Sequence, residues 1–518
     1  ILANGLHDQA FCENWVLGWE RWRDFIIEKG YTPEWAAPIT DIAAADIRAL
    51  AEEIAAADGC VIFASRGVNQ HTYSTQINRV LMFVAAITGN MGRKGGAYMN
   101  MSATIPIDAS VPEERRARMT RPAVRKTPSG WLKAMAEHKP YPVTALIASN
   151  NPLSHWPGQA AARKALEALE LLVYIDLFPT ETSAFADYVL PAATGIEKGE
   201  IGRANDDRRI VWIDRMMAPP GEAKPDEWIW TELGKRLGFS DVMHEKYKDP
   251  AVMWDEVLIQ NESMRGVTQA RLHSVPWRWV RFPVASEDAE EIETLYLEGT
   301  TAVGAPPGHR FPTASGKLEF WTEDLEAKFG ALGLSPLPEF YGERETLHDM
   351  AFLESLDGDE TDGILSPFDA QPVATSRARI VQPGNDTPGH RMREAGFDTE
   401  LVTGRPAAPQ FHSWTHYAWQ AQEMWPDLYV QIHPEKAGAL GIGDGDRVRV
   451  ETAYGTAEAR AWVTAAIRPT AVFMPIGWGE NQPFHPWRSV NFLTDSSQRD
   501  PASQQTNLKA LLCRISRA

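Results

Sequence analysis

The chain has 518 residues, and its 51 Lys and Arg against 69 Asp and Glu give a formal net charge of −18 at pH 7. Single domains seldom exceed roughly 250 residues, so about three domains are expected. This charge would repel a nucleic-acid backbone, and the sequence has no basic stripe to offset it, which argues against a nucleic-acid partner. No window approaches the ~18 uninterrupted apolar residues of a membrane helix, so direct membrane insertion is not expected.

The cysteines exclude some metal sites. Cys12, Cys60 and Cys513 are the three cysteines, and no C-x-x-C pair occurs. Neither a zinc ribbon nor an iron–sulfur cluster can therefore be built from this chain alone. The opening "ILANGLHDQAF" has no initiator Met, basic region or apolar leader, which is typical of the middle of a gene. We therefore expect an N-terminal portion to be missing, and the compartment is left open.

Helices alternate with buried strands in the first part of the chain. In "DIAAADIRALAEEIAAADGC" the apolar spacing is helical, with Asp41 as the expected N-cap. A second run repeats the pattern further along. The expected elements after residue 60 are a strand at 61–65, a helix at 76–89, a strand at 143–149, a helix at 158–170 and a strand at 171–176. This alternation predicts parallel sheets covered on both faces.

The stretch "SRGVNQHTYSTQINR", residues 65–79, places polar side chains where a strand passes into a helix. In α/β folds ligands bind at this point, because helix N-terminal N–H groups and loop side chains converge there. Asn69, Gln70 and His71 are therefore candidate site residues. The alternatives are a polar loop with an N-cap and a structural histidine.

The second half changes character twice. From about 216 to 345 the pattern weakens, although Gly316 in "FPTASGKLEFWTE" predicts a turn into an alternating strand. Residues 354–372 predict a linker or exposed loop, because Asp362 and Phe368 stand where a calcium loop needs Gly and Glu. From about 396 onward, short alternating runs separated by turn residues predict a small β-barrel or sandwich. "GIGDGD" at 441–446 precedes a strand and is interpreted as a turn.

Several motifs in order carry a resemblance that spans nearly the whole chain. They are "GVNQH", "INR", "ITGN", "SNNPLSHWPG", "DLFPTETSAFADYVLPAATGIEKGE", "LVTGR", "HSWT", "VQIHPEKAGALGIGDGDRVRV" and "VNFLT". Together they resemble the molybdopterin oxidoreductases of the dimethyl sulfoxide reductase family. The resemblance implies an α/β fold of two Rossmann-like parallel-sheet lobes followed by a C-terminal β-barrel of the double-psi type. The expected divisions are the rest of a first lobe at 1–128, a second lobe at 129–345, a linker or exposed loop at 346–395 and the barrel at 396–518.

The family's cofactor is a molybdenum or tungsten atom held by two molybdopterin guanine dinucleotides. Family members carry the metal ligand and a [4Fe-4S] cluster upstream of the matched region, so we expect both in the missing portion or a partner and assign no metal ligand here. Pyrophosphate, ribose and guanine call for helix N–H groups, cationic side chains and Asp, Asn or Thr. The resemblance assigns cofactor binding to Asn69, Asn150, Asn151, Asp176, Thr180, Thr182, Arg203, Asn205, Thr403, Gly404, Arg405, His412, Thr415, Asn491, Gln505 and Lys509.

Other interpretations of these residues stay open. Asn151 before Pro152 could form a plain turn, and Asp176 could cap the turn after its strand. Arg203 and Asn205 belong to a charged run that could be a solvated face. Gln70 and His71 are expected to line the cavity, and no catalytic residue is assigned.

The resemblance implies two-electron redox chemistry or oxygen-atom transfer on a small substrate. Formate dehydrogenases and periplasmic nitrate reductases have a Gly-Gln pair after the "TGN" loop, and residues 89–106 lack it. This favours an S-oxide, an N-oxide or a sulfur oxyanion over formate, with an iron–sulfur electron-transfer subunit as partner. The alternatives are a non-catalytic scaffold subunit of a redox complex and an unrelated nucleotide-binding α/β enzyme. The latter lacks a P-loop or G-x-G-x-x-G motif.

Overall fold

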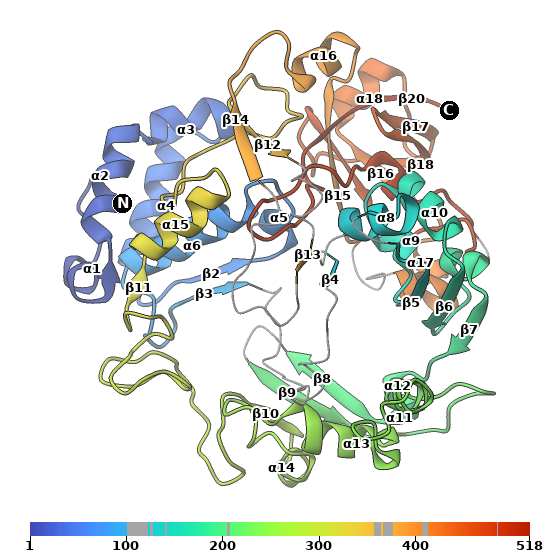
Figure 1. Ribbon diagram of the computed structural model, residues 1–518. Coiled ribbons are helices and arrows are strands. Elements are labelled where there is room, and N and C mark those ends of the chain that lie inside the picture. Colours follow the sequence, from blue (N-terminus) through green and yellow to red (C-terminus); the bar gives the residue numbers. More distant parts are fainter. Residues whose placement is uncertain are drawn as a thin grey trace.

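The computed structural model describes residues 1–100, 123–124, 128–139, 142–204, 208–356, 364–365, 377–406, 413–483 and 485–518. Figure 1 shows the N-terminal helices at the left, the C-terminal barrel at the upper right, the β5–β7 lobe at the right and the β8–β10 sheet at the bottom of the view. Within the described ranges, no helix is both long and apolar enough to cross a membrane.

The first lobe packs helices beside a two-stranded parallel sheet. Strand β2 (Val61–Ala64) pairs in parallel with β3 (Ala97–Asn100). The Phe83 ring stacks on Phe320 with centroids 3.6 Å apart, and Trp22 meets both rings edge-on. The helices and short strand of this region are α1 (Gln9–Trp15), β1 (Val16–Leu17), α2 (Trp19–Lys29), α3 (Pro33–Thr40), α4 (Ala44–Ala56), α5 (Arg66–Asn69) and α6 (Ser74–Ile87).

Two expected details of this lobe differ in the structure. Asp41 is not an N-cap: it ends α3 with φ +58°, and α4 begins after Ala43. Asp tolerates the left-handed region better than most residues, which suits it to a helix end. The turn at Gly316 is confirmed, with φ +72°, but the strand after it is only β11 (Leu318–Glu319), paired in parallel with β1.

The second parallel sheet has the order β5-β6-β7. Its strands are β5 (Ala145–Ser149), β6 (Leu171–Asp176) and β7 (Tyr188–Pro191). Helices α8 (Pro128–Ala136) and α10 (Gln159–Glu167) bury one face, where Leu172 and Tyr174 are fully covered. On the other face Ile147 and Leu171 are partly exposed and Tyr188 is exposed, so cover on both faces is not found among the described residues.

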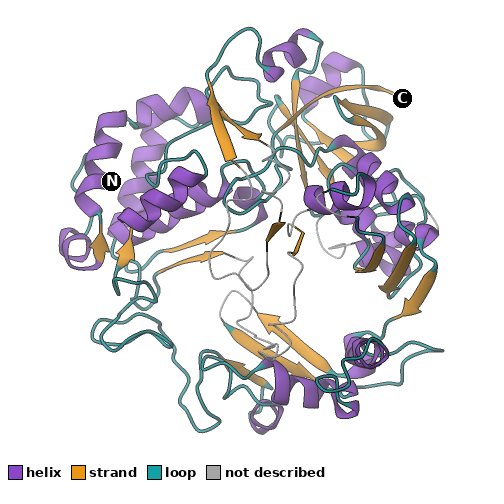
Figure 2. Cartoon of the chain, in the orientation of Figure 1, coloured by secondary structure: helices purple, strands orange, loops and turns teal. Residues whose placement is uncertain are grey.

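The region between this sheet and the barrel holds smaller elements (Figure 2). An antiparallel sheet β10-β9-β8 forms around the buried side chains Ile210 and Val280. The predicted linker also holds an antiparallel pair, β12 with β14. The remaining elements outside the barrel, including α9 and η1 within the β5–β7 lobe, are α9 (Pro152–His155), η1 (Glu181–Phe185), α11 (Gly195–Lys198), β8 (Glu200–Ala204), β9 (Arg209–Ile213), α12 (Asp226–Arg236), η2 (Glu245–Lys248), α13 (Pro250–Met253), η3 (Trp254–Leu258), α14 (Gln269–Ser274), β10 (Trp279–Arg281), α15 (Glu323–Ala331), β12 (Phe352–Leu356), β14 (Arg377–Val381) and α16 (Pro388–Glu394), with β4 (Ala123–Val124) paired to β13 (Ile364–Leu365).

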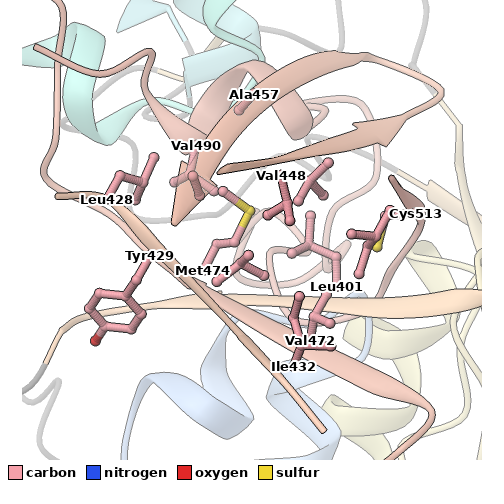
Figure 3. Packing of buried hydrophobic residues seen from close by; sticks show 14 of the residues in the cluster. Leu401, Leu428, Tyr429, Ile432, Val448, Ala457, Val472, Met474, Val490 and Cys513 are labelled. Atoms are coloured by element: carbon pink, nitrogen blue, oxygen red, sulfur yellow. The ribbon is translucent and has the colours of Figure 1, made fainter. Parts of the chain in front are cut away.

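The C-terminal part is a closed six-stranded barrel, as predicted, in the order β15-β19-β16-β18-β17-β20. Side chains alternate along the strands: Val448 and Val450 point into the core, whereas Arg447 and Arg449 are exposed. Figure 3 shows Leu401, Val472 and Met474 in this core. The elements are β15 (Thr399–Gly404), η4 (Ser413–Tyr417), α17 (Trp419–Met424), β16 (Tyr429–Ile432), α18 (Pro434–Leu440), β17 (Arg447–Thr452), β18 (Gly455–Val463), β19 (Ala471–Pro475), η5 (Val490–Leu493) and β20 (Leu511–Arg517).

The divisions predicted at residues 128, 345 and 395 stay predictions. The structure shows that contacts cross the first of them, because Phe320 belongs to the same apolar cluster as Phe83. The parallel sheets and the closed barrel confirm the predicted fold class. The double-psi connectivity rests on the resemblance.

Candidate functional site

Cationic side chains from separate segments gather beside the end of β15. Arg405 follows Gly404, the last residue of β15, and Arg66 begins α5. Burial, then the charges of Arg405 and Arg66, lower the pKa of Lys509 to about 8. Burial and Arg405 lower the pKa of His155, at the end of α9, to about 4. Like charges held this close disfavour one another's charged forms, so the cluster favours an anion between them.

The backbone approaches the cluster closely at Gly404. A Cβ there would lie 2.8 Å from the Phe473 ring and 3.6 Å from Nζ of Lys509. The Lys509 ammonium donates to the carbonyl of Thr403. The Thr403 hydroxyl is buried and donates to the carbonyl of Leu508 at 2.8 Å, so it serves the fold. The structure therefore brings Gly404, Arg405 and Lys509 together, as the resemblance implied.

The carboxyl ends of β5 and β6 bring a second group of candidates together. Asn151 donates its backbone N–H to Asp176 at 3.1 Å, and its side-chain oxygen accepts from the Thr182 hydroxyl at 2.9 Å. Thr180 shares a 2.7 Å hydrogen bond with the Tyr174 hydroxyl. Parallel strands end at the same edge of a sheet, which explains why residues 25 to 31 apart meet here.

Asn150 differs from Asn151 although both have positive φ, +61° and +43°. Asn151 is buried within the network, whereas the Asn150 side chain is exposed at the sheet edge. The left-handed conformation explains why Asn occupies both positions, because few other side chains tolerate it. Of the pair, Asn150 is thus the one whose side chain is accessible.

Asn491 connects the barrel to the loop after β5. Its buried amide donates to the carbonyl of Ser154 at 2.5 Å. Next to it, the Gly158 N–H donates to the Thr494 hydroxyl at 3.1 Å. Within the described part of the chain, Oδ1 of Asn491 and Oγ of Ser154 are buried without a hydrogen-bond partner. Buried polar atoms are nearly always paired, so these two atoms indicate a bound water or ligand group.

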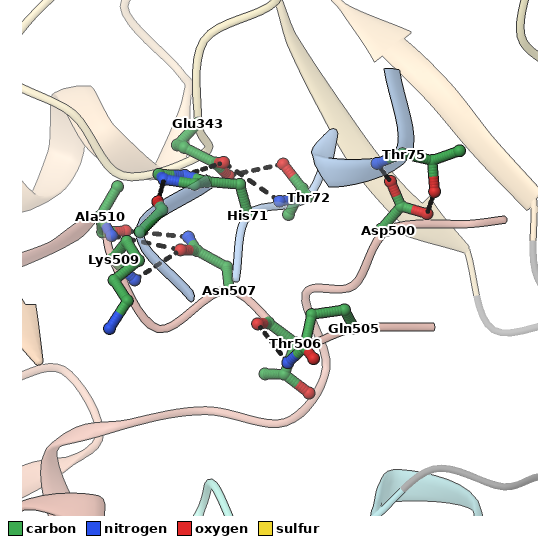
Figure 4. Close-up of polar contacts among 11 residues, drawn as sticks. His71, Thr72, Thr75, Glu343, Asp500, Gln505, Thr506, Asn507, Lys509 and Ala510 are labelled. Carbon is green, nitrogen blue, oxygen red and sulfur yellow. Dashed lines mark hydrogen bonds and ion pairs between the residues drawn. The ribbon is translucent and has the colours of Figure 1, made fainter. Parts of the chain in front are cut away.

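The loop 65–75 is held from two sides (Figure 4). His71 Nδ1 lies 2.9 Å from the Glu343 carboxylate and Nε2 lies 3.0 Å from the carbonyl of Gly67. The carbonyl of Gln70 accepts from the Leu508 N–H at 3.0 Å. Both ring nitrogens of His71 are thus engaged by the fold, which supports the structural alternative for this residue.

The other candidates are more dispersed. Asn69 forms an amide cluster with Asn78 and Asn100, in which the Asn100 amide lies 2.9 Å from Asn69 Oδ1. Thr415 lies in η4, and the half-buried Gln505 donates to the carbonyl of Thr506 at 3.2 Å. Arg203 pairs with Ile210 in the β8–β9 register. Asn205 and His412 lie outside the described residues.

Comparison with known families identifies the chain. A model described as "Molybdopterin oxidoreductase" matches residues 31–236, and one described as "Molydopterin dinucleotide binding domain" matches residues 400–512. The chain belongs to the molybdopterin oxidoreductases. Both domains bind a molybdopterin dinucleotide cofactor that carries molybdenum or tungsten, and the second covers the barrel with Arg405 and Lys509. The resemblance inferred from the sequence motifs is thereby confirmed.

Relatives with assigned names are distant but span most of this molybdopterin oxidoreductase. It is 24% identical to the thiosulfate reductase molybdopterin-containing subunit PhsA of Salmonella typhimurium, over 92% of this chain and 60% of that protein. It is 25% identical to a nitrate reductase of Symbiobacterium thermophilum, over 100% of this chain and 64% of that protein. It is 26% identical to formate dehydrogenase H of Escherichia coli, over 92% of this chain and 59% of that protein. The chain therefore spans about 60% of the length of these relatives.

A solved structure supports the fold. Acetylene hydratase from Pelobacter acetylenicus superimposes with a TM-score of 0.73 at 21% sequence identity, covering 100% of this chain and 69% of that chain. At this identity the likeness concerns the fold. It agrees with the lobes and barrel described above.

The residues present fit the cofactor of this family. Its pyrophosphate is an anion that matches the Arg66, Arg405 and Lys509 cluster. The orphaned Oδ1 of Asn491 and Oγ of Ser154 offer further hydrogen bonds. Sequence reasoning missed Arg66 and His155 as members of this cluster, although each lies within a quoted stretch of the sequence. Their position at the carboxyl ends of β2 and β5 was the signal that could have identified them.

Proposed function

We propose that this chain forms the cofactor-enclosing part of a prokaryotic molybdenum or tungsten oxidoreductase that holds two molybdopterin guanine dinucleotides. When bound, the metal centre supplies two-electron redox chemistry or oxygen-atom transfer on a small substrate. The observation that carries the proposal is the convergence of Arg66, Arg405 and Lys509 at the end of β15. Guanidinium and ammonium groups gathered in a partly buried site suit the pyrophosphate of a dinucleotide.

The residues divide between the parts of one dinucleotide. Arg66, Arg405 and Lys509 would neutralise its pyrophosphate, and the exposed Asn150 would reach its base or ribose. Asp176 has a different role, because its carboxylate oxygens accept from the backbone N–H groups of Asn151 and Leu177. It would therefore shape the loop that presents Asn150.

For the substrate, we propose an S-oxide, an N-oxide or a sulfur oxyanion. The thiosulfate reductase subunit among the relatives is named for a sulfur oxyanion. Formate dehydrogenases are also among them, but the Gly-Gln pair expected for formate chemistry is absent from residues 89–106. An iron–sulfur protein or domain would exchange electrons with the site. The alternative is a non-catalytic subunit that keeps the same fold within a larger redox complex.

The test is retention of the cofactor by an Arg405→Ala variant. Losing a charge-assisted contact costs on the order of 1.5 to 3 kcal/mol, which corresponds to about a ten- to hundredfold weaker affinity. We expect the purified variant to lose molybdenum or tungsten together with guanine nucleotide, while its unfolding midpoint changes little. Arg460→Ala is the matched control, because Arg460 lies on the outer surface of the same barrel near Asp427. Undiminished metal and nucleotide in the Arg405→Ala variant would refute the assignment.

A further inference from the structure

A buried carboxyl lies between the second lobe and the C-terminal part of the chain. Glu181 begins η1, just after the end of β6, and is 4% exposed. Its Oε2 accepts from the Asn151 amide at 2.8 Å. Its Oε1 accepts from the Tyr417 hydroxyl at 3.4 Å, and Tyr417 belongs to η4, which follows β15. One carboxyl thus contacts both the loop after β5 and the C-terminal part.

The backbone after β19 closes in on the same carboxyl. A Cβ built on Gly479 would lie 1.1 Å from Oε1 of Glu181, so any larger residue there would displace the carboxyl. Nearby, the Asn481 amide donates to the carbonyl of Thr180 at 3.1 Å. Three segments of different origin therefore converge on η1.

The surroundings of Glu181 disfavour its charged form. Burial raises the pKa of this carboxyl, and the hydrogen bonds from Asn151 and Tyr417 oppose the rise only in part. No Lys, Arg or His in the described ranges forms an ion pair with it. The titratable group facing it is Tyr417 from η4, and Tyr417 in turn faces Tyr174 and Asp176 from β6.

We propose that Glu181 is a positioning residue that fastens the Asn150–Asn151 loop of the second lobe to the C-terminal part, through Asn151, Tyr417 and the backbone at Gly479. The inference rests on the proposed function for its purpose. Arg405 and Lys509 come from the C-terminal part, whereas Asn150 comes from the second lobe. One dinucleotide can be held by both sets only if the distance between the two parts is fixed.

The contacts of Glu181 with Asn151 and Tyr417 form with an uncharged carboxyl. Glutamine has the same shape and keeps an acceptor for Asn151 or Tyr417, so Glu181→Gln should preserve the contact. Alanine removes it and leaves a cavity beside Gly479. An acid with a raised pKa binds its proton more tightly in the folded protein. Its contribution to stability is therefore full at low pH and is lost as pH rises above the unfolded value near 4.5.

The experiment compares Glu181→Gln, Glu181→Ala and Tyr417→Phe in the purified protein. The readouts are the thermal midpoint from pH 5 to 8 and the rate at which guanine nucleotide is released. Glu181→Ala should release nucleotide at least about tenfold faster than the wild type, and Glu181→Gln should release it at the wild-type rate. The wild-type midpoint should fall relative to that of Glu181→Gln as pH rises. In a double-mutant cycle, the effects of Glu181→Ala and Tyr417→Phe should be non-additive.

Glu345 supplies a matched control. It is 2% exposed, accepts from the Tyr454 hydroxyl, and burial raises its pKa as well, but it contacts neither Asn151 nor Tyr417. Glu345→Ala should lower the thermal midpoint and leave nucleotide release unchanged. Equal release from the Glu181→Ala variant and the wild type, or Glu181→Gln behaving like Glu181→Ala, would overturn the inference. If the wild type carries no pterin, the proposed function fails, while the pH profile and the double-mutant cycle still decide the role of Glu181.

Discussion

At the scale of single residues, the candidate site is recognisable by cationic side chains that lower one another's pKa values. Burial lowers the pKa of Arg405, and the charge of Arg66 lowers it further. The pKa of Lys509 is lowered by burial and by the charges of Arg405 and Arg66. A protein gains no stability from such a cluster when it stands alone, because like charges in a partly buried site repel. A bound anion reverses the sign of the interaction.

The Lys509 side chain predicts a pH dependence of anion binding. Its pKa is lowered to about 8, so the ammonium loses its proton as pH rises through this value and its attraction for phosphate disappears. We expect the affinity of cofactor-free protein for GDP, which carries guanine and a diphosphate, to weaken between pH 7 and 9.5. Isothermal titration calorimetry measures this change. Lys509→Gln should bind GDP more weakly at pH 7 and show a flatter profile; an unchanged profile would contradict the role given to Lys509.

At the scale of elements, the sequence predicted what local patterns control. β6 (Leu171–Asp176) matches its predicted range. Asn151, Asp176 and Thr182 meet because they follow or end parallel strands, whose carboxyl ends lie at the same edge of the sheet. The prediction of an N-cap at Asp41 was wrong, because two helices meet there and apolar spacing does not show where one helix ends and the next begins. The contacts of Glu181 with residues 417 and 479 could not be predicted, because no local pattern encodes a partner 236 or more residues away.

The contact between the C-terminal loop at Asp500 and helix α6 is likewise too distant in sequence to be predicted from local patterns. It supports a prediction about stability. Asp500 is 1% exposed and accepts from the N–H and hydroxyl of Thr75, as well as from the backbone of Ala502 and Ser503. Asp500→Ala removes an acceptor from four part-buried hydrogen bonds, and a typical bond of this kind contributes about 0.5 to 1.5 kcal/mol. We expect the free energy of unfolding to fall by about 2 to 4 kcal/mol in urea titrations. Asp444→Ala, which removes one exposed bond to Val463, should cost less than about 1 kcal/mol. Equal losses in the two variants would contradict this.

At the scale of the whole molecule, the residues proposed to bind the dinucleotide belong to parts that are far apart in sequence. Arg66 comes from the first lobe, Asn150 from the second, and Arg405 and Lys509 from the C-terminal part. Contacts between the parts, such as Thr75 with Asp500 and Ser154 with Asn491, bring these residues into one region. A bound dinucleotide would therefore stabilise the arrangement of the parts as well as the local loops.

This arrangement predicts the metal content of the protein. Iron–sulfur clusters of the usual kind need about four thiolates, and the sequence has three cysteines, of which Cys12 and Cys513 are buried. Burial raises the pKa of both thiols, Cys12 to about 12, so neither is poised to bind metal as a thiolate. Molybdenum or tungsten would be held through the dithiolenes of the pterins, which would require no cysteine of this chain. Protein expressed from this sequence should therefore contain molybdenum or tungsten with about two guanine nucleotides per metal, and no stoichiometric iron. Elemental analysis and nucleotide chromatography measure both. A Cys60→Ala variant should keep the same metal content, and cluster iron in stoichiometric amount would show that the site has been misread.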